Sequence, residues 1–341
     1  MPQAMIAPQG LIRGTVTAGT LHLRRYEALT WLDGWVHHFS RDNSDPAKPW
    51  YRMHDKDDKG VSEADFPAPL VVGDKLGIYK VPGYEALIVR NGEMFRYSHD
   101  NIKWSQTSPH PLLKDVIGAP TLFRADDPVF GILRTTIQAM IPTRRGLIHF
   151  GYAPEWDLWL PRNIIIREET GWPTGYADTR GGYQVFFEIA GKLRSFSIGT
   201  DPLFLGTNEF PNNIVAPDGA ATGIQGWPSI DLDGPFPTLF HDDSQILVPR
   251  REKNKEGFNS LIHYWVSAQQ YNPVWNSAVI PGIYSGSAAL MTTGLRTILR
   301  EDQRHKESDD YMLALAPNGA DIYSITRNGQ TAQWSEPVKV I

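Results

Sequence analysis

Short runs of alternating apolar and polar residues recur along this chain, and turn residues separate them. The clearest example is residues 84–89, which Asn91-Gly92 separates from a second such run at residues 93–97. Alternation with period two, in aromatic and β-branched residues, is typical of half-buried strands. Asn-Gly accepts the positive φ that a two-residue hairpin loop requires. This stretch therefore predicts a β-hairpin.

The frame of this hairpin is repeated along the sequence. A tyrosine precedes a glycine by eight residues four times, at Tyr26 and Gly34, Tyr84 and Gly92, Tyr183 and Gly191, and Tyr311 and Gly319. A second pair of segments, 120–123 and 147–150, recurs as 237–240 and 261–264, at offsets of 117 and 114 residues. Two repeats of about 50 to 60 residues account for these offsets, and such periods are typical of propeller blades.

The repeat predicts an all-β fold: a six-bladed β-propeller with four-stranded antiparallel blades, as a single domain over residues 1–341. The predicted blades are residues 11–66, 67–117, 118–171, 172–233, 234–285 and 286–341. The Pro-, Gly- and Asn-rich tract at 208–226 leaves a seventh blade as the alternative. Apolar residues at helical spacing occur at 127–140, where a strand fits as well.

Smaller features complete the expected layout of the blades. Trp104-Ser105 and Trp334-Ser335 are expected to be fourth strands, and Asn318-Gly319 a hairpin turn. We also expect the N-terminal strand to pair with the last blade, because closure removes the exposed edges that an open array of sheets would leave.

Composition narrows the classes of function. Charged residues make up 21% of the 341, and the 30 Gly and 26 Pro indicate a globular chain rich in turns. A net charge of −5 gives no basic field, which argues against nucleic acid as the partner. The absence of cysteine excludes disulfides, thiolate nucleophiles and Cys-based metal sites. No apolar run is long enough for a membrane span, so we expect no membrane partner, in a cytoplasmic protein or a secreted mature form.

The blade layout resembles a known family. Its recurring features are an opening x-Pro-x-Leu strand, as at 119–122 and 236–239, an apolar strand, a Gly turn and a closing Trp, as at Trp104 and Trp334. This arrangement resembles the lectin-type β-propellers, such as the six-bladed fungal fucose lectins. The resemblance implies their fold and implies carbohydrate binding as the kind of function.

The resemblance also implies where a sugar site would lie. In that family a site combines an Arg on the second strand, a Glu on the third strand and a Trp or Tyr from the neighbouring blade. The matching positions of this chain hold Glu27, Glu85 and Gln184 on second strands, and Arg96 and Arg194 on third strands. Because Arg and Glu do not stand where the family has them, fucose specificity does not carry over.

Two histidines are the candidate catalytic residues. His149 and His263 occupy the same position of two repeats, and imidazole suits acid–base work or metal ligation. The alternative is that each packs between blades, because its neighbours in the strand are apolar. The acid pairs 126–127 and 242–243 fit turn caps, and no Asp-x-Asp-x-Asp-Gly motif is present, so we expect no metal. No phosphate-loop or dinucleotide motif occurs, and no cofactor is expected.

The candidate ligand-binding residues are charged or aromatic groups near strand ends: Arg24, Glu27, Lys80, Glu85, Trp104, Arg134, Arg250 and Arg300. Pointing into the central funnel, the cations would form an anion pocket; pointing outward, they would form a solvated rim. The loops do not repeat, so the sequence favours one asymmetric central pocket, which binds carbohydrate or another small molecule. An enzyme acting on a sugar or other small molecule, as a hydrolase, lyase or cyclase, and a protein-interaction platform are the alternatives. The oligomeric state is left open.

Overall fold

The computed structural model describes residues 5–18, 21–32, 35–42, 49–52, 75–80, 84–99, 104–127, 134–153, 156–177, 183–189, 192–198, 229–230, 244–251, 259–266, 276–285, 288–292, 311–328, 331 and 333–340. Within these ranges the chain forms strands, bridges and turns, and no helix. This part of the chain therefore contains no helix that is long and apolar enough to cross a membrane. Residues 127–140 contain the end of one strand and the start of another, as the strand alternative predicted.

The described strands form antiparallel sheets of consecutive strands. Sheet 1 contains β1 (Met5–Ala18), β2 (Leu21–Leu32), β3 (Trp35–Asp42) and β4 (Tyr51–Arg52). Sheet 2 contains β5 (Lys75–Lys80), β6 (Tyr84–Arg90), β7 (Glu93–His99) and β8 (Trp104–Gln106). Sheet 3 contains β9 (Thr121–Asp127), β10 (Arg134–Thr143), β11 (Gly146–Ala153) and β12 (Leu158–Ile166).

Three further sheets follow in the same way. Sheet 4 contains β13 (Gly171–Ala177), β14 (Tyr183–Ile189) and β15 (Lys192–Ile198). Sheet 5 contains β16 (Ser229–Ile230), β17 (Ser244–Arg251), β18 (Asn259–Val266) and β19 (Asn276–Tyr284). Sheet 6 contains β20 (Ala289–Thr292), β21 (Tyr311–Asn318), β22 (Asp321–Asn328) and β23 (Val338–Lys339).

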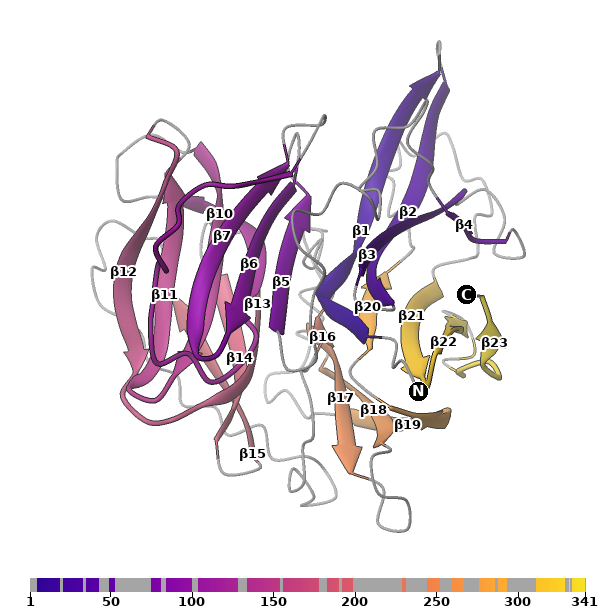
Figure 1. Ribbon diagram of the computed structural model, residues 1–341. Helices are drawn as coiled ribbons and strands as arrows, with labels where there is room; N and C mark the ends of the chain where they lie inside the picture. Colours follow the sequence, from indigo (N-terminus) through magenta and orange to yellow (C-terminus); the bar gives the residue numbers. More distant parts are fainter. Residues whose placement is uncertain are drawn as a thin grey trace, which may run out of the picture.

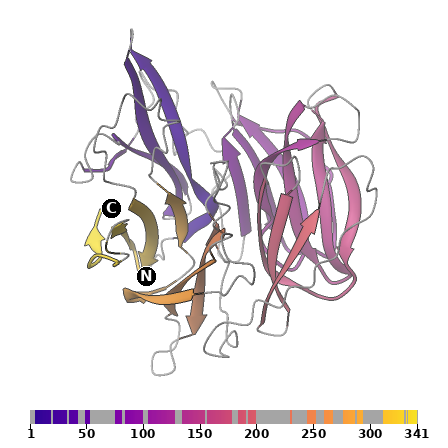
Figure 2. The same ribbon diagram turned by 180° about the vertical axis from the view of Figure 1, so that it is seen from behind.

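The first strands of these sheets contact one another in a closed cycle. β1 contacts β5, β5 contacts β9, β9 contacts β13, β13 contacts β16, β16 contacts β20, and β20 contacts β1. Figure 1 shows sheets 2 to 4 on one side of the molecule and sheets 5, 6 and 1 on the other, and Figure 2 shows the same division from behind. A closed cycle of sheets is the arrangement that the repeat predicted. The blade count of the whole chain stays a prediction, because residues 199–228 and 231–243 lie outside the described ranges.

The closure itself differs from the expectation. The expectation was that the N-terminal strand pairs with the last blade. Among the described strands, however, β1 is hydrogen-bonded to β2, and it packs against β20 and β21 of the last sheet without pairing with them. Close packing of inner strands takes the place of pairing. At Gly77 on β5, for example, an added Cβ would overlap the carbonyl oxygen of Pro120, next to β9, so only glycine allows this approach.

The hairpin turns follow the sequence closely, with one shift. Asn91 and Gly92 have φ values of 54° and 79° between the paired residues Arg90 and Glu93, which is the two-residue turn predicted for this hairpin. In sheet 6, Asn318 pairs with Asp321, so the loop is residues 319–320 rather than 318–319. Only its first residue has positive φ, 63° at Gly319, which is the pattern of a type II′ turn.

The two expected closing strands had different outcomes. Trp104 begins β8, as predicted. Trp334 forms only an isolated bridge with Arg327, and the described fourth strand of sheet 6 is Val338–Lys339. The expectation that Trp334-Ser335 forms the fourth strand was therefore wrong: Trp334 pairs with the third strand at one bridge, and the fourth strand begins four residues later, at Val338. The repeated tryptophan predicts the position of that bridge and not the position of the strand.

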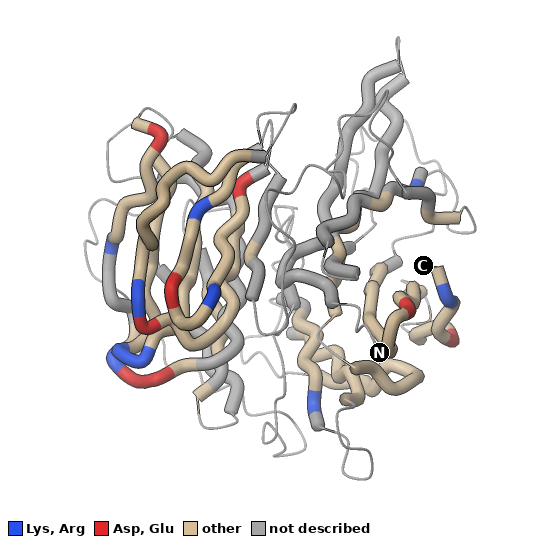
Figure 3. Tube along the Cα trace, in the orientation of Figure 1, with Lys and Arg blue, Asp and Glu red and all other residues tan. Residues whose placement is uncertain are grey.

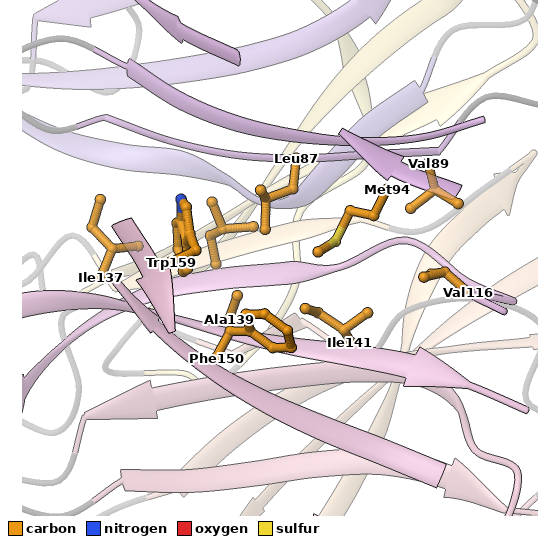
Figure 4. Close-up of a cluster of buried hydrophobic side chains, with 10 residues drawn as sticks. Leu87, Val89, Met94, Val116, Ile137, Ala139, Ile141, Phe150 and Trp159 are labelled. Atoms are coloured by element: carbon orange, nitrogen blue, oxygen red, sulfur yellow. The ribbon is translucent and has the colours of Figure 1, made fainter. Parts of the chain in front are cut away.

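The core lies between neighbouring sheets. Figure 4 shows Leu87 and Met94 of sheet 2 facing Ile137, Phe150 and Trp159 of sheet 3, all of them buried. Similar clusters join sheets 3 and 4, sheets 5 and 6, and sheets 6 and 1. Burying one such side chain contributes about 1.5 to 3 kcal/mol. A polar group in these interfaces must find a partner there, because an unmade hydrogen bond in an apolar interior is costly.

Candidate functional site

A buried ion pair lies in the interface between sheets 2 and 3. Side chains alternate along a strand, so Glu85 on β6 faces the same side as Leu87, whose cross-strand partner is Arg96 on β7. Arg96 donates from Nε to Oε2 of Glu85 and from Nη2 to Oε1, both at 2.9 Å. Both side chains are 5% exposed. This is the bidentate geometry, with two parallel hydrogen bonds, in which an Arg–carboxylate pair is strongest.

Sheet 3 completes the coordination of this pair. Arg96 donates from Nη1 to the backbone oxygen of Asp157 at 2.7 Å and from Nη2 to its Oδ1 at 2.6 Å. Tyr152 donates its hydroxyl to the same Oδ1 at 2.7 Å, and Trp159 Nε1 lies 3.5 Å from Glu85 Oε2. We call Glu85, Arg96, Tyr152, Asp157 and Trp159 the Glu85–Arg96 cluster. It joins two sheets through charged and aromatic groups within an apolar interface.

The cluster opens to solvent at Asp157. This side chain is 69% exposed, and its backbone has φ 53°, a left-handed conformation that Asp tolerates better than most residues. The residues on either side of it in the chain, Trp156 and Leu158, are 59% and 52% exposed. A fixed carboxylate therefore lies beside exposed apolar surface.

The charges in the cluster are held in their ordinary forms. Burial lowers the pKa of Arg96, but the bonds and charges of Glu85 and Asp157 more than reverse this and leave it raised. Burial raises the pKa of Asp157, and the hydrogen bonds from Arg96 and Tyr152 outweigh it, so the net shift is downward. Burial and then the bond to Asp157 raise the pKa of Tyr152 to about 12. Near neutral pH the cluster offers a carboxylate acceptor and a phenol, and not a group poised for proton transfer.

His149 lies in the next interface, between sheets 3 and 4. Its Nε2 is 2.6 Å from Oε1 of Gln138, and the side chain is buried. Burial and then the charge of Arg162 lower its pKa to about 3, so the ring is neutral at physiological pH. The catalytic assignment of His149 stays a prediction.

His263 lies between sheets 5 and 6. Its ring stacks on Trp265 at 4.9 Å between centroids and meets the edge of Trp334 at 5.3 Å. The guanidinium of Arg327 lies 4.8 Å from the centre of the Trp265 ring. Burial and then Arg327 lower the pKa of His263 to about 3. We call these four residues the Trp265–Arg327 cluster, and the catalytic assignment of His263 also stays a prediction.

Arg96, His149 and His263 occupy one structural position. Each is the cross-strand partner of an apolar residue on the second strand, in the pairs Leu87–Arg96, Met140–His149 and Leu247–His263. Two residues before that apolar residue stand Glu85, Gln138 and Gln245. The sequence repeat matched the two histidines but not Arg96. Counting from the hairpin loop would have found it, because Arg96 and His149 are both the fourth residue of their strands.

The other predicted ligand-binding residues are placed less completely. The backbones of Arg24 and Glu27 lie on β2, Lys80 on β5, Trp104 on β8 and Arg134 on β10, but their side chains lie outside the described part. Arg250 lies on β17 and is partly exposed, and Arg300 lies outside the described residues. Among the predicted set, the structure brings Glu85 into a cluster, together with Arg96.

Tyr152, Asp157 and Trp159 were not selected from the sequence. For Tyr152 and Trp159, the cross-strand register of the other sheets provides a signal. Tyr152 pairs with Trp159 in the same way as His99 pairs with Trp104 and Arg327 with Trp334. The closing tryptophan therefore has a fixed neighbour on the third strand. Asp157 has no such signal, since it belongs to a connection that the other sheets do not repeat.

Known structures resemble this arrangement. Two structures of the lectin from Aleuria aurantia, described as fucose-specific and as a six-bladed β-propeller, match the chain with TM-scores of 0.58 and 0.53. They are 12% and 10% identical, cover 98% and 99% of this chain, and are covered over 96% and 95% of their own length. The chain folds as a β-propeller. The predicted fold class and the predicted likeness to lectin-type propellers are confirmed.

At such low identity the likeness extends to the fold of this propeller and not to a ligand. No protein-family model matches the chain, and no curated protein sequence matches it. Among the described residues no group of three or more His, Asp or Glu side chains could hold a metal ion. In Figure 3 acidic and basic positions lie close to one another on sheets 2 and 3, so this part of the molecule carries no field of one sign.

Proposed function

We propose that this propeller binds carbohydrate, and that the Glu85–Arg96 cluster carries a sugar site where the interface of sheets 2 and 3 reaches the surface. One observation carries the proposal: Arg96 and Tyr152, from two neighbouring sheets, both bind the exposed carboxylate of Asp157. The same arginine is bound to Glu85, whose carboxylate Trp159 also approaches. These are the residue types that the lectin resemblance implies at a blade interface, with the acid and the Arg exchanged between the second and third strands.

Asp157 suits a hydroxyl-rich ligand because it is already ordered. Arg96 and Tyr152 both donate to Oδ1, so the exposed carboxylate can accept a sugar hydroxyl without first losing conformational freedom. Exposed Trp156 and Leu158 add an apolar surface of the kind that packs against the C–H face of a sugar. Glu85 and Arg96 are too buried to be reached and act as positioning residues.

A single pocket in the central funnel, lined by strand-end cations such as Arg134 and Arg250, is the competing location for the sugar. The two locations differ in the residues that binding requires. A site at Asp157 needs an ordered acid at the edge of the interface, whereas a funnel pocket needs the cations. Substitutions at the two places therefore separate them.

The test begins with a glycan array on the purified chain, followed by calorimetric titration of the best ligand. Asp157→Asn removes the carboxylate but keeps a residue that tolerates positive φ, and we expect at least a tenfold loss of affinity, about 1.4 kcal/mol. Asp115→Asn is the matched control, because Asp115 is also exposed, has φ 61° and pairs with an arginine, Arg145 at 3.6 Å.

Three results would contradict the proposal in different ways. If no glycan binds, the carbohydrate function fails. If Asp157→Asn and Asp115→Asn bind alike, the location fails. If Arg134→Ala or Arg250→Ala abolishes binding while Asp157→Asn does not, the funnel pocket is the site.

A further inference from the structure

Sheets 3 and 6 present the same pair of positions to the sheet before them. Tyr152 is the seventh residue of β11 and pairs with Trp159; Arg327 is the seventh residue of β22 and bridges to Trp334. Tyr152 and Trp159 meet the Glu85–Arg96 pair of sheet 2. In the same way, Arg327 and Trp334 meet Trp265 and His263 of sheet 5. The Trp265–Arg327 cluster is therefore the structural counterpart of the Glu85–Arg96 cluster.

The first of these interfaces shows how the fold holds a carboxylate. Glu85 accepts two hydrogen bonds from Arg96, and the indole nitrogen of Trp159 lies 3.5 Å from its Oε2. In sheet 5 the counterpart of Glu85 is Gln245, since Gln245 pairs with Trp265 as Glu85 pairs with Ser98. The second interface thus has an arginine at the position of Tyr152, an indole at the position of Trp159, and a glutamine at the strand position where the first has a glutamate.

The indole of Trp334 supplies an independent observation. Its Nε1 is buried and has no hydrogen-bond partner among the residues that the structure describes. A buried donor without an acceptor is unfavourable and uncommon in folded proteins, so a ligand that supplies an acceptor would satisfy it. Trp265, Arg327 and Trp334 are all partly exposed, so the cluster borders solvent although the Nε1 atom itself is covered.

The charge of the cluster favours an anion. Arg327 lies against the Trp265 ring, and burial lowers its pKa, which means that its charge is partly desolvated. His263 is buried and neutral and so does not compete for the anion. Glu336, two residues beyond Trp334, is exposed, and solvent screens its charge. Arg327 stands at the position of Tyr152 and not at that of Arg96, so it would donate to an anionic ligand from sheet 6 rather than from sheet 5.

We propose that the Trp265–Arg327 cluster binds the carboxylate of an acidic sugar, a hexuronic acid, with Arg327 and Trp334 Nε1 as the donors. The carboxylate occupies the role that Glu85 has in the other interface. This inference rests on the proposed carbohydrate-binding function and adds a second site with a different class of ligand, so the two interfaces divide neutral from acidic sugars.

The experiment titrates the full chain with D-glucuronate and D-galacturonate. D-glucose and D-galactose are the matched neutral sugars, and acetate is the bare carboxylate. Binding is followed by calorimetry and by tryptophan fluorescence, since the cluster contains two indoles. We expect one of the uronates to bind at least ten times more tightly than its neutral partner and than acetate.

Two variants assign the binding to this interface. Arg327→Gln removes the charge, and Trp334→Phe keeps an aromatic ring but removes the N–H donor; each should weaken uronate binding about tenfold or more. Arg145→Gln is the control, because Arg145 is exposed and its loss changes the net charge equally. Circular dichroism and the melting temperature show whether each variant is folded. A variant that unfolds is replaced by Arg327→Lys, which should still bind uronate more weakly than wild type because it lacks the planar fork.

The outcomes also separate this inference from the proposed function. Uronate binding that is no tighter than acetate binding, or that Arg327→Gln leaves unchanged, overturns the second site even if neutral glycans bind through Asp157. Uronate binding that depends on Arg327 and Trp334 supports the second site even if the array shows no neutral ligand at Asp157.

Discussion

Arg96 is hydrogen-bonded to Glu85, Tyr152 and Asp157, and this decides what its loss would do. It satisfies the buried carboxylate of Glu85, holds two atoms of Asp157 and lies 4.9 Å from the centre of the Tyr152 ring. A buried ion pair adds little net stability, because desolvation offsets its attraction, but breaking it leaves a charge unpaired. The cluster is therefore more important as a constraint on position than as a source of stability.

We predict that Arg96→Ala lowers the free energy of unfolding by about 3 to 5 kcal/mol, because Glu85 would remain buried without a partner. Replacing both residues, with Arg96→Met and Glu85→Leu, should recover most of that loss. Urea denaturation of the two variants measures the difference. Equal stability of Arg96→Ala and the surface variant Arg145→Ala would show that the pair is not buried as described.

The two buried histidines predict a dependence of stability on pH. Their pKa values fall from 6.5 to about 3 on folding, so below pH 6.5 the unfolded chain binds protons that the folded chain does not. Stability is then complete above the unfolded pKa and declines as the pH falls toward 3. Urea midpoints between about pH 7 and pH 4 should fall less steeply in His149→Gln than in wild type. If the urea midpoints of His149→Gln and wild type fall equally steeply with pH, the His149 ring is exposed to water in the folded protein and not buried.

At the scale of elements, the hairpins and the interfaces between sheets follow different kinds of information. Local residues determine a turn, so Asn91-Gly92 could be predicted completely. The shift by one residue at Gly319 arises because spacing from a tyrosine does not reveal the cross-strand register. The residues around Glu85 could not be predicted for another reason. Tyr152 and Trp159 belong to the next sheet, and the sequence of one strand does not show which side chains of a neighbouring sheet pack against it.

Gly319 offers a test at this scale. Its φ is 63° and a Cβ would meet nothing within 4 Å, so an added methyl group costs only backbone strain. We predict that Gly319→Ala lowers the free energy of unfolding by about 1 to 2 kcal/mol, and Gly319→Asn by less, because Asn tolerates positive φ. Thermal or urea unfolding measures both. A larger loss in the Asn variant than in the Ala variant would mean that packing, and not conformation, controls this turn.

For the whole molecule, the arrangement of sheets decides whether sites act together. The Glu85–Arg96 cluster joins sheets 2 and 3 and the Trp265–Arg327 cluster joins sheets 5 and 6, on the two sides of the molecule seen in Figure 1. The sequence predicted this ring from its repeats, and it predicted a single central pocket because the loops differ. Differences between loops do not exclude sites at the interfaces, where strand residues such as Arg96 and Tyr152 position the contacting group.

If both proposed sites exist, we predict that they bind independently. Each cluster is built from its own pair of sheets, and no described residue belongs to both. The affinity for a neutral glycan should therefore stay the same, within about twofold, in the presence of saturating uronate. Sequential calorimetric titration measures this. Competition between the two ligands would instead indicate one shared pocket, as a funnel site would require.

The exchange of acid and arginine in the Glu85–Arg96 pair bears on how such proteins can diverge. Reversing the order takes two substitutions, and either one alone would bury two like charges side by side at a cost of several kcal/mol. That is a large share of the stability of a typical domain, so the intermediate would hardly accumulate in a cell. A lineage with Glu on the second strand could reach the opposite order only through an uncharged stage. We therefore expect the order of acid and arginine in this pair to change less readily during divergence than exposed residues of the surrounding loops.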